Sequence, residues 1–554
     1  MRPGLWRRLQ YRLIRLGDAA RAASPWRSQR RPTRLSAAAV LTRDPPKPQS
    51  YFRRGSQPYT RWWWLAGPFH DDEIDRQLRW LKDQGFGGVE IAWLSPSWLG
   101  LPAGVEWLGP EWRRLVLHAK SVAEELGMGC DFTFGSAWPF GGSHVTPEHA
   151  AQTFHGLSSQ RLISSWEEEI HARSDLRIIN HLRRQSLQYY AMPLLDALAD
   201  ALQVSPSALF CDSLEIETRE LWDERLWARF LDRFGYDLEP FVSDLDGLPE
   251  VRHDARALIG DVILEEFYQE FARLCRDRGA FARVQCHGAP TDLLAAYAAV
   301  DVPESECLLF PPTFSRIAAS AAALEGRPIV SCETFTCLHG FLPAADSVVS
   351  WKREHVADLK LLADAVIAEG VNQIVWHGTP FNPADGFISF YASVHVGPDS
   401  RLVPHLREFN SYLETVCDLM RIGRTESRLA VYFPMEDARM LDKIPRADRV
   451  PGSLHHWEMR HAVAPRESRG FAPLWISLPF LDRGEVIDRR LVVGEQVFEA
   501  LLVDVEWLEL RSLERIARLV ESGLVVILAR RPRQPGVRKS PDFARILDDI
   551  EGRP

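Results

Sequence analysis

Long hydrophobic runs are missing from this sequence of 554 residues, and none approaches the roughly 20 residues that a membrane-spanning helix needs. That absence argues against an integral membrane protein. An excess of positive charge is also missing. The net charge of −9 argues against a protein that binds nucleic acid as a whole. The 35 Gly and 37 Pro show no collagen-like period. With 46% hydrophobic residues the chain can bury sizeable cores, which excludes global disorder.

Cysteine is sparse and shows no metal-binding spacing. None of the eight Cys forms a C-x-x-C pair, and most lie inside apolar, strand-like runs. We therefore predict reduced, buried thiols, which are typical of a reducing compartment. The N-terminus lacks the continuous apolar segment of a secretory signal, so a cytoplasmic location is expected.

The charge is distributed unevenly along the chain. Residues 1–50 carry eleven Arg and one Lys against two Asp, a net charge of +10, so the remainder carries −19. The Pro-rich segment 44–48 then separates this arm from the body. We predict a solvated, poorly ordered arm over residues 1–58. Binding to anionic lipid or nucleic acid, or an organellar targeting role, are the alternatives for such a basic segment.

Strand-like and helix-like stretches alternate from residue 59 onward. Eight strands are predicted, at 61–65, 88–94, 128–134, 208–216, 281–287, 301–306, 329–335 and 371–377. Helical sequence follows each strand, and this strict alternation favours a parallel sheet, while the count of eight favours its closure. We therefore predict a (β/α)8 TIM barrel over residues 59–424. An open doubly wound sheet is the alternative.

A second, smaller α/β unit of flavodoxin-like type is predicted over residues 425–554. Strands are expected at 429–433, 498–503 and 524–528, with a helix over 512–522. This unit offers no Gly-rich phosphate motif. We therefore assign it a structural role.

Polar and aromatic groups gather at the predicted C-terminal ends of the barrel strands, where barrel enzymes place their active sites. The set comprises Trp64, Glu90, Asp131, Trp138, Asp212, Glu215, His287, Glu304, Glu306, Glu333, Trp376 and His377. Burying so many carboxylates is unfavourable unless they are paired, protonated or coordinated. Each group alone is also compatible with a buried ion pair or a hydrogen-bonded core histidine. Their coincidence at one rim indicates a functional site.

Paired carboxylates beside aromatic rings are the groups that glycoside hydrolysis requires. One acid protonates the leaving oxygen, while a carboxylate opposite it either activates water or attacks the anomeric carbon. Glu-x-Glu with a nearby His could instead hold a divalent cation, with oxygen ligands favouring Ca²⁺ or Mg²⁺ and mixed His and carboxylate ligands admitting Zn²⁺ or Mn²⁺.

These motifs, in this order, resemble glycoside hydrolase family 106, the α-L-rhamnosidase family. The matching stretches are RWWW (61–64), GPF (67–69), GFGGVEI (85–91), GSAWPFGG (135–142), FCDSLE (210–215), QCHGAP (285–290), DVPESE (301–306), SCETF (331–335) and WHGTP (376–380). The resemblance covers about residues 60–385. The sequence departs from the family pattern in its basic arm, its short insertion near 140–175 and the absence of a β-sandwich module after the α/β unit.

The resemblance implies an inverting mechanism and a Ca²⁺ that engages sugar hydroxyls. It implies that Glu215 is the general acid and Glu333 the general base. Glu304 and Glu306 are expected to be sugar or metal contacts, and we place the metal on them. The expected sugar-binding residues are Trp64, Glu90, Trp138, Asp212, His287, Trp376 and His377.

The leading hypothesis is thus a glycoside hydrolase that cleaves terminal α-L-rhamnosyl or similar deoxy-sugar linkages. Its expected partner is a glycoside or oligosaccharide, with no nucleic acid and no membrane span. A metal-dependent sugar lyase or isomerase would use the same barrel with His287, Glu304 and Glu333 as ligands. A non-catalytic carbohydrate-binding relative is the third hypothesis.

Overall fold

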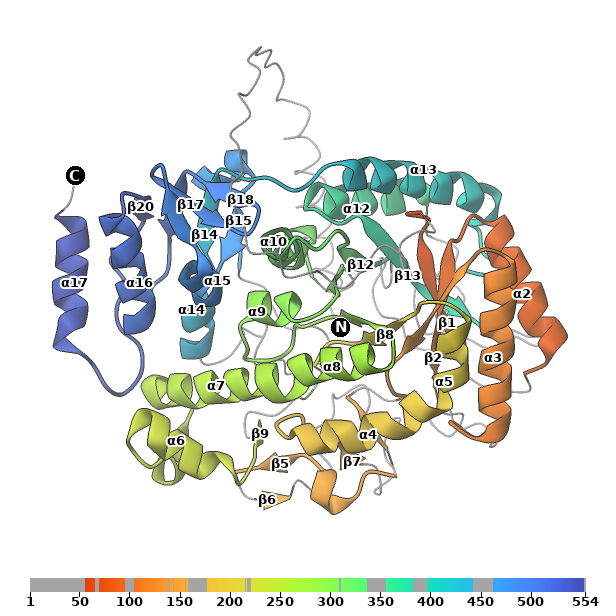
Figure 1. Cartoon of the computed structure of the whole chain (residues 1–554), viewed down its shortest axis with the longest axis horizontal. Coiled ribbons are helices and arrows are strands. Elements are labelled where there is room, and N and C mark those ends of the chain that lie inside the picture. Colours follow the sequence, from red (N-terminus) through yellow and green to blue (C-terminus); the bar gives the residue numbers. More distant parts are fainter. Residues whose placement is uncertain are drawn as a thin grey trace, which may run out of the picture.

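The computed structural model shows a closed barrel beside a smaller unit with its own sheet (Figure 1). It describes residues 55–64, 69–94, 104–136, 139–142, 144–154, 156–157, 177–214, 216, 221–307, 310–335, 355–381, 396–441 and 462–552. The predicted arm over 1–58 lies outside these residues except for its last four. In the described part of the chain, no helix has the length and apolar character needed to cross a membrane.

The barrel closes eight parallel strands in the order β1-β13-β12-β11-β10-β8-β3-β2. Their bounds are β1 Tyr59–Trp64, β2 Gly88–Trp93, β3 Gly129–Thr133, β8 Ala208–Cys211, β10 Phe281–Val284, β11 Val302–Glu306, β12 Ser331–Thr334 and β13 Gln373–Pro380. Each overlaps a strand predicted from the sequence, and closure excludes the open-sheet alternative. The (β/α)8 barrel is therefore confirmed.

Helices pack around the outside of this barrel (Figure 1). They are α2 Asp71–Asp83, α3 Pro110–Glu125, α4 Arg184–Ala197, α5 Ala199–Val204, α6 Leu226–Phe234, α7 Pro249–Ile263, α8 Gln269–Asp277, α9 Leu293–Ala298, α10 Ser315–Glu325, α12 Val356–Ala368 and α13 Val403–Ile422. Helices α7 and α8 are joined by one π-helical turn, Leu264–Tyr268. Short 3-10 turns occupy Pro147–His149, Glu239–Asp244 and Pro312–Phe314.

Strand alternation decides which side chains enter the barrel. In β1 the rings of Trp62 and Trp64 point outward, and Trp62 Nε1 donates to Gln77 on α2 at 2.9 Å. The alternate residues Tyr59 and Arg61 therefore point inward. The Tyr59 ring fills one end of the barrel because its neighbours are glycines. A Cβ on Gly129 of β3 would lie 1.9 Å from the Tyr59 hydroxyl.

Short strands flank the barrel between β3 and α6. They are β4 Gly141–Gly142, β5 Gln152–Thr153, β6 Gly156–Leu157, β7 Arg177–Ile178 and β9 Leu221–Trp222. Strands β4 and β7 pair with each other, and β6, β5 and β9 form a second antiparallel sheet. Most of the insertion predicted near 140–175 lies outside the described residues.

The C-terminal unit contains a four-stranded parallel sheet in the order β15-β14-β19-β20. Its strands are β14 Leu429–Tyr432, β15 Leu474–Ile476, β19 Ala500–Val503 and β20 Val525–Leu528, and a three-stranded sheet adds β16 Glu485–Ile487, β17 Arg490–Val493 and β18 Gln496–Phe498. The helices are α14 Met435–Met440, α15 Leu478–Arg483, α16 Leu510–Glu521 and α17 Pro541–Glu551, with a 3-10 turn at Arg466–Phe471. The flavodoxin-like type and the boundary at residue 425 stay predictions.

Helices α7 and α10 of the barrel both contact this unit, and α7 does so through two arginines. Arg252 donates to the carbonyl of Met440 at 2.5 Å, and Arg256 donates to the carbonyls of Arg439 at 3.0 Å and Leu441 at 2.5 Å. Both arginines are buried. They satisfy backbone acceptors at the C-terminus of α14 that the helix itself leaves open, and their positive charge suits the negative end of the helix.

Candidate active site

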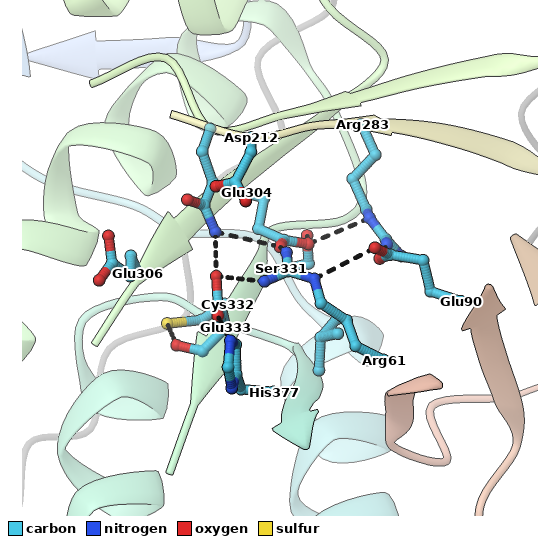
Figure 2. A network of polar contacts seen from close by, with 12 residues as sticks. Arg61, Glu90, Asp212, Arg283, Glu304, Glu306, Ser331, Cys332, Glu333 and His377 are labelled. Atoms are coloured by element: carbon cyan, nitrogen blue, oxygen red, sulfur yellow. Dashed lines mark hydrogen bonds and ion pairs between the residues drawn. The ribbon is translucent and has the colours of Figure 1, made fainter. Parts of the chain in front are cut away.

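Two buried arginines occupy the middle of the barrel. Arg61 on β1 donates to Glu90 on β2 through Nε at 3.1 Å and to Glu304 on β11 through Nη2 at 3.0 Å. Its third nitrogen, Nη1, lies 2.5 Å from Glu333 Oε2 on β12. Arg61 is only 2% exposed, so all of these charges are withdrawn from water. Figure 2 shows the Arg61 guanidinium between Glu90 and Glu333.

Arg283 on β10 completes this network. It contacts Glu90, Asp131 on β3 at 3.0 Å, and Glu304 at 3.1 Å. Both guanidinium groups lie over the ring of Phe210 on β8, with centroid distances of 3.9 Å for Arg61 and 5.2 Å for Arg283. Buried carboxylates are tolerated when they are paired and hydrogen-bonded, and these arginines provide the partners.

Two arginines do not balance the carboxyl groups around them. Counted formally, they face the four groups of Glu90, Asp131, Glu304 and Glu333, an excess of two negative charges. The barrel interior is therefore anionic on the side of the site.

Glu333 is the carboxyl group with the most elaborate environment. Burial alone would raise its pKa. The charge of Arg61, the neighbouring His377 and hydrogen bonds from Arg61 and Gln285 outweigh burial and lower the pKa to about 2. Gln285 Nε2 donates to Glu333 Oε2 at 2.7 Å. The two donors thus favour the ionised form of this carboxylate, and a carboxylate must be ionised to accept a proton as a general base.

His377 on β13 lies beside this carboxylate. Its Nε2 is 3.5 Å from Glu333 Oε1, and its ring centroid is 5.2 Å from that of Trp63. Burial lowers the pKa of His377 to about 4, although Glu333 opposes the shift. A neutral imidazole donates one hydrogen bond from one ring nitrogen and accepts one at the other, which suits contact with a hydroxyl group.

Asp212, Glu306 and His287 form the other side of the site (Figure 2 shows Glu306 apart from the arginines). Desolvation, opposed by Arg61 and assisted by Glu333 and Glu306, raises the pKa of Asp212 to about 7. Glu306 Oε2 lies 2.8 Å from His287 Nε2. Within the described part of the chain, Glu306 Oε1, His287 Nδ1 and the side-chain oxygen of Gln285 are buried without a hydrogen-bond partner. Unsatisfied buried polar atoms gathered at one rim indicate a place for a ligand.

The backbone fixes the loops that carry these groups. Leu214, two residues after Asp212, donates its N–H to the carbonyl of His287 at 2.9 Å. Gly288 has a φ of +86°, and a Cβ there would lie 2.1 Å from the Leu214 carbonyl oxygen, so only glycine fits this close approach. On β12, Phe335 follows Glu333 by two residues and has a φ of +73°, a strained conformation for a bulky residue.

Two predicted contact residues belong to the arginine network instead. Glu90 is fully buried. Its carboxylate forms ion pairs with Arg61 and Arg283 and accepts a hydrogen bond from the Thr133 hydroxyl. Glu304 is fully buried as well, with one oxygen on Arg61 and the other 2.8 Å from the Ser331 hydroxyl. Both groups are thus bound within the arginine network, and the predictions that Glu90 binds sugar and that Glu304 binds metal stay untested predictions.

Two tryptophans predicted to bind sugar also lie elsewhere. Trp64 is fully buried outside the barrel, stacked on Phe69 at 4.9 Å. Trp376 is fully buried with its centroid 4.4 Å from that of Phe335. Strand alternation points both rings away from the barrel interior. The inward neighbours are Trp63 and His377.

The structure thus brings together Asp212, His287, Glu306, Glu333 and His377 of the predicted set. Glu215 and Trp138 lie outside the described residues. Sequence reasoning missed Arg61, Arg283 and Gln285. The signal available for them was polarity: Arg61 and Arg283 are charged residues inside barrel strands, and Gln285 directly follows the last residue of β10.

Oxygen atoms suited to a hard cation are present, although a complete set of protein ligands is not. No group of three or more His, Cys, Asp or Glu with metal-binding geometry occurs among the described residues. Ca²⁺ also accepts amide and hydroxyl oxygens, and it takes six to eight ligands in all. By their chemistry, Glu306 Oε1 and the Gln285 side-chain oxygen, which lack hydrogen-bond partners among the described residues, and the Asp212 carboxyl group are candidate ligands for such a cation.

Comparison with known proteins gives one family match. The model of the family described as alpha-L-rhamnosidase, glycoside hydrolase family 106, matches residues 178–552. A curated protein of Formosa agariphila, named putative beta-glucuronidase, is 23% identical over 359 residues. The match covers 62% of this chain and 28% of that protein, so this chain spans less than a third of its curated relative.

Several solved structures share the architecture, and two of them illustrate it. The rhamnosidase from Novosphingobium sp. PP1Y superposes with a TM-score of 0.63 at 13% identity, covering 91% of this chain and 71% of that one. The β-galactosidase from Bacillus circulans sp. alkalophilus superposes with a TM-score of 0.51 at 12% identity, covering 85% and 71%. At these identities the likeness shows the fold.

Proposed function

This chain belongs to glycoside hydrolase family 106, the family described as alpha-L-rhamnosidase, and on that premise we propose that it hydrolyses terminal α-L-rhamnosyl or similar deoxy-sugar linkages with inversion. The observation that carries the proposal is Glu333, an ionised carboxylate at the barrel rim between Arg61, Gln285 and His377. The family supports the sugar, and the anionic, oxygen-rich rim supports the reaction class.

In this mechanism Glu333 accepts a proton from a water molecule, and the oxygen of that water attacks the anomeric carbon. The bond from that carbon to the leaving oxygen breaks as the general acid protonates the leaving oxygen. We assign the general acid to Glu215 by its resemblance to the family. His377 and His287 would hold sugar hydroxyls by hydrogen bonds.

A Ca²⁺ is proposed as part of the site. Glu306, Asp212 and the Gln285 side-chain oxygen would hold it. It would supply positive charge beside an anionic rim and oxygen coordination for sugar hydroxyls. The raised pKa of Asp212 supports this proposal, since a cation would relieve the repulsion that Asp212 meets from Glu333 and Glu306.

The experiment is a release assay with purified protein on p-nitrophenyl α-L-rhamnopyranoside, in a panel that includes p-nitrophenyl β-D-glucuronide, with Ca²⁺ or chelator. We expect release from the rhamnoside, β-anomeric rhamnose as the first product by NMR, and a loss of about 10²–10⁴-fold in turnover for Glu333→Gln. Glu436→Gln is the matched control, because it also replaces a buried glutamate, in the C-terminal unit. Release from the glucuronide alone would mean that the sugar is a glucuronosyl group and not a rhamnosyl group. An active Glu333→Gln would refute the assignment of the base.

Two other outcomes would favour the alternatives. Sugar binding by calorimetry, with no product from any glycoside, would support a non-catalytic carbohydrate-binding protein. A tightly bound transition metal, with all activity lost to chelator, would support a sugar lyase or isomerase.

A further inference from the structure

The two oxygens of Glu333 have different environments. Oε2 receives both strong donors, Arg61 Nη1 at 2.5 Å and Gln285 Nε2 at 2.7 Å. Among the described residues, the contact of Oε1 is with His377 Nε2, at 3.5 Å. That separation is long for a direct hydrogen bond and leaves the neighbourhood of Oε1 open to a bridging water. An acceptor already bound by a guanidinium and an amide is a poor place for a further proton.

Arg61 itself has no freedom to move. Its other two nitrogens are taken by Glu90 and Glu304, and its face lies on the Phe210 ring. Each of those carboxylates is also bound to Arg283. Figure 2 shows this chain of contacts running from Arg283 through Glu90 and Glu304 to Arg61. The position of Arg61 is therefore set by four strands of the barrel, and the position of Glu333 is set by Arg61.

We propose that Arg61 is a positioning residue that, with Gln285, clamps Oε2 of Glu333 and leaves Oε1 as the atom that takes the proton from the attacking water. This inference rests on the proposed function for its catalytic consequence. The water gives one proton to Oε1 and its oxygen forms the new bond to the anomeric carbon, while the leaving oxygen takes its proton from the general acid. Arg61 exchanges no proton in this step. It fixes the direction in which Oε1 points.

Arg283 provides a matched control. It is an equally buried arginine of the same network, and its ion pairs among the described residues are with Glu90, Asp131 and Glu304, not with Glu333. Lysine keeps the charge in both positions but loses the three-pronged geometry. We expect Arg61→Lys to lower kcat by about 10²-fold, the size of effect that a displacement of about 1 Å can cause. KM should change less than threefold. Arg283→Lys should lose thermal stability to a comparable degree, but its kcat, per folded molecule, should fall much less than that of Arg61→Lys, because Arg283 reaches Glu333 indirectly, through the carboxylates that bind Arg61.

A third variant tests the clamp without disturbing a buried charge. Gln285→Met removes the second donor to Oε2. It also removes an oxygen proposed to bind Ca²⁺, so it is assayed in saturating Ca²⁺, where we expect kcat to fall about tenfold with the fold intact. Equal kcat losses in Arg61→Lys and Arg283→Lys would overturn the proposal, since they would reveal a general role in the core. Unchanged kcat in both Arg61→Lys and Gln285→Met would overturn it as well.

Crystal structures of the two lysine variants separate this proposal from the proposed function. The clamp predicts that the Glu333 carboxylate turns or shifts in Arg61→Lys and keeps its place in Arg283→Lys. That result is independent of turnover, so a parent protein that cleaves no glycoside would refute the proposed function and leave the clamp supported. A Glu333 carboxylate that stays in place without Arg61 would refute the clamp alone.

Discussion

Arg283→Met is the perturbation that most directly tests the ionic core of the barrel. The methionine retains much of the side-chain volume and removes a charge that contacts Glu90, Asp131 and Glu304, all fully buried. Removing one partner of a buried ion pair costs about 3–5 kcal/mol, because the other charge stays buried and unpaired. The stability of a typical domain is about 5–15 kcal/mol, so the variant should lose a large share of it.

Urea unfolding followed by tryptophan fluorescence measures this loss, since the chain has 19 Trp. Arg76→Met is the control: its ion pair with Glu73 lies on the surface of α2, where such pairs contribute about 0–1 kcal/mol. The double variant Arg283→Met/Glu90→Gln should recover about 1 kcal/mol or more, because one of the stranded charges is gone. A loss for Arg283→Met no larger than that of Arg76→Met would refute the reasoning.

Three further predictions concern the core, the rim and the C-terminal unit. Trp64→Ala should cost about 3–5 kcal/mol of stability and leave KM unchanged, a result that kinetics and urea unfolding check together. Ca²⁺ at 100 times its Kd should stabilise the parent by about 2.7 kcal/mol in thermal unfolding, and Asp212→Asn should abolish the effect. No response of the parent to Ca²⁺ would count against the metal. Burial and Glu509 raise the pKa of Glu436 from its usual 4.5 to about 8. The folded state therefore binds this proton more tightly than the unfolded chain, and stability should fall as pH rises between those values. Glu436→Gln should flatten that part of the unfolding curve against pH, and an unchanged slope would contradict the assignment.

The barrel was predictable because its signal is local. Apolar runs of strand length alternate with helical sequence, and all eight observed strands overlap predicted ones. The acids at strand ends were predictable for the same reason, since parallel strands place their C-terminal ends together.

The position of a side chain along the barrel axis could not be predicted from a local pattern. Glu304 and Glu306 have the same parity on β11, and both point inward. Register decides between them: Glu304 pairs with Ser331, at the level of the arginines, and Glu306 pairs with Glu333 at the rim. That register depends on neighbours far away in the sequence. Arg61 and Glu304 form an ion pair although they are 243 residues apart in the sequence, so no local sequence pattern could predict it.

The arginine contacts between α7 and α14 determine whether the barrel and the C-terminal unit can be expressed separately. A barrel expressed without the C-terminal unit would keep Arg252 and Arg256 but lose the carbonyl groups that they bind. Two guanidinium groups and the apolar surface around them would then face water in place of protein. The C-terminal unit therefore cannot be exchanged for another domain without a change to the barrel surface that it covers. Any chimaera that swaps it must reproduce a helix end at this position, or replace both arginines by residues that tolerate an open face.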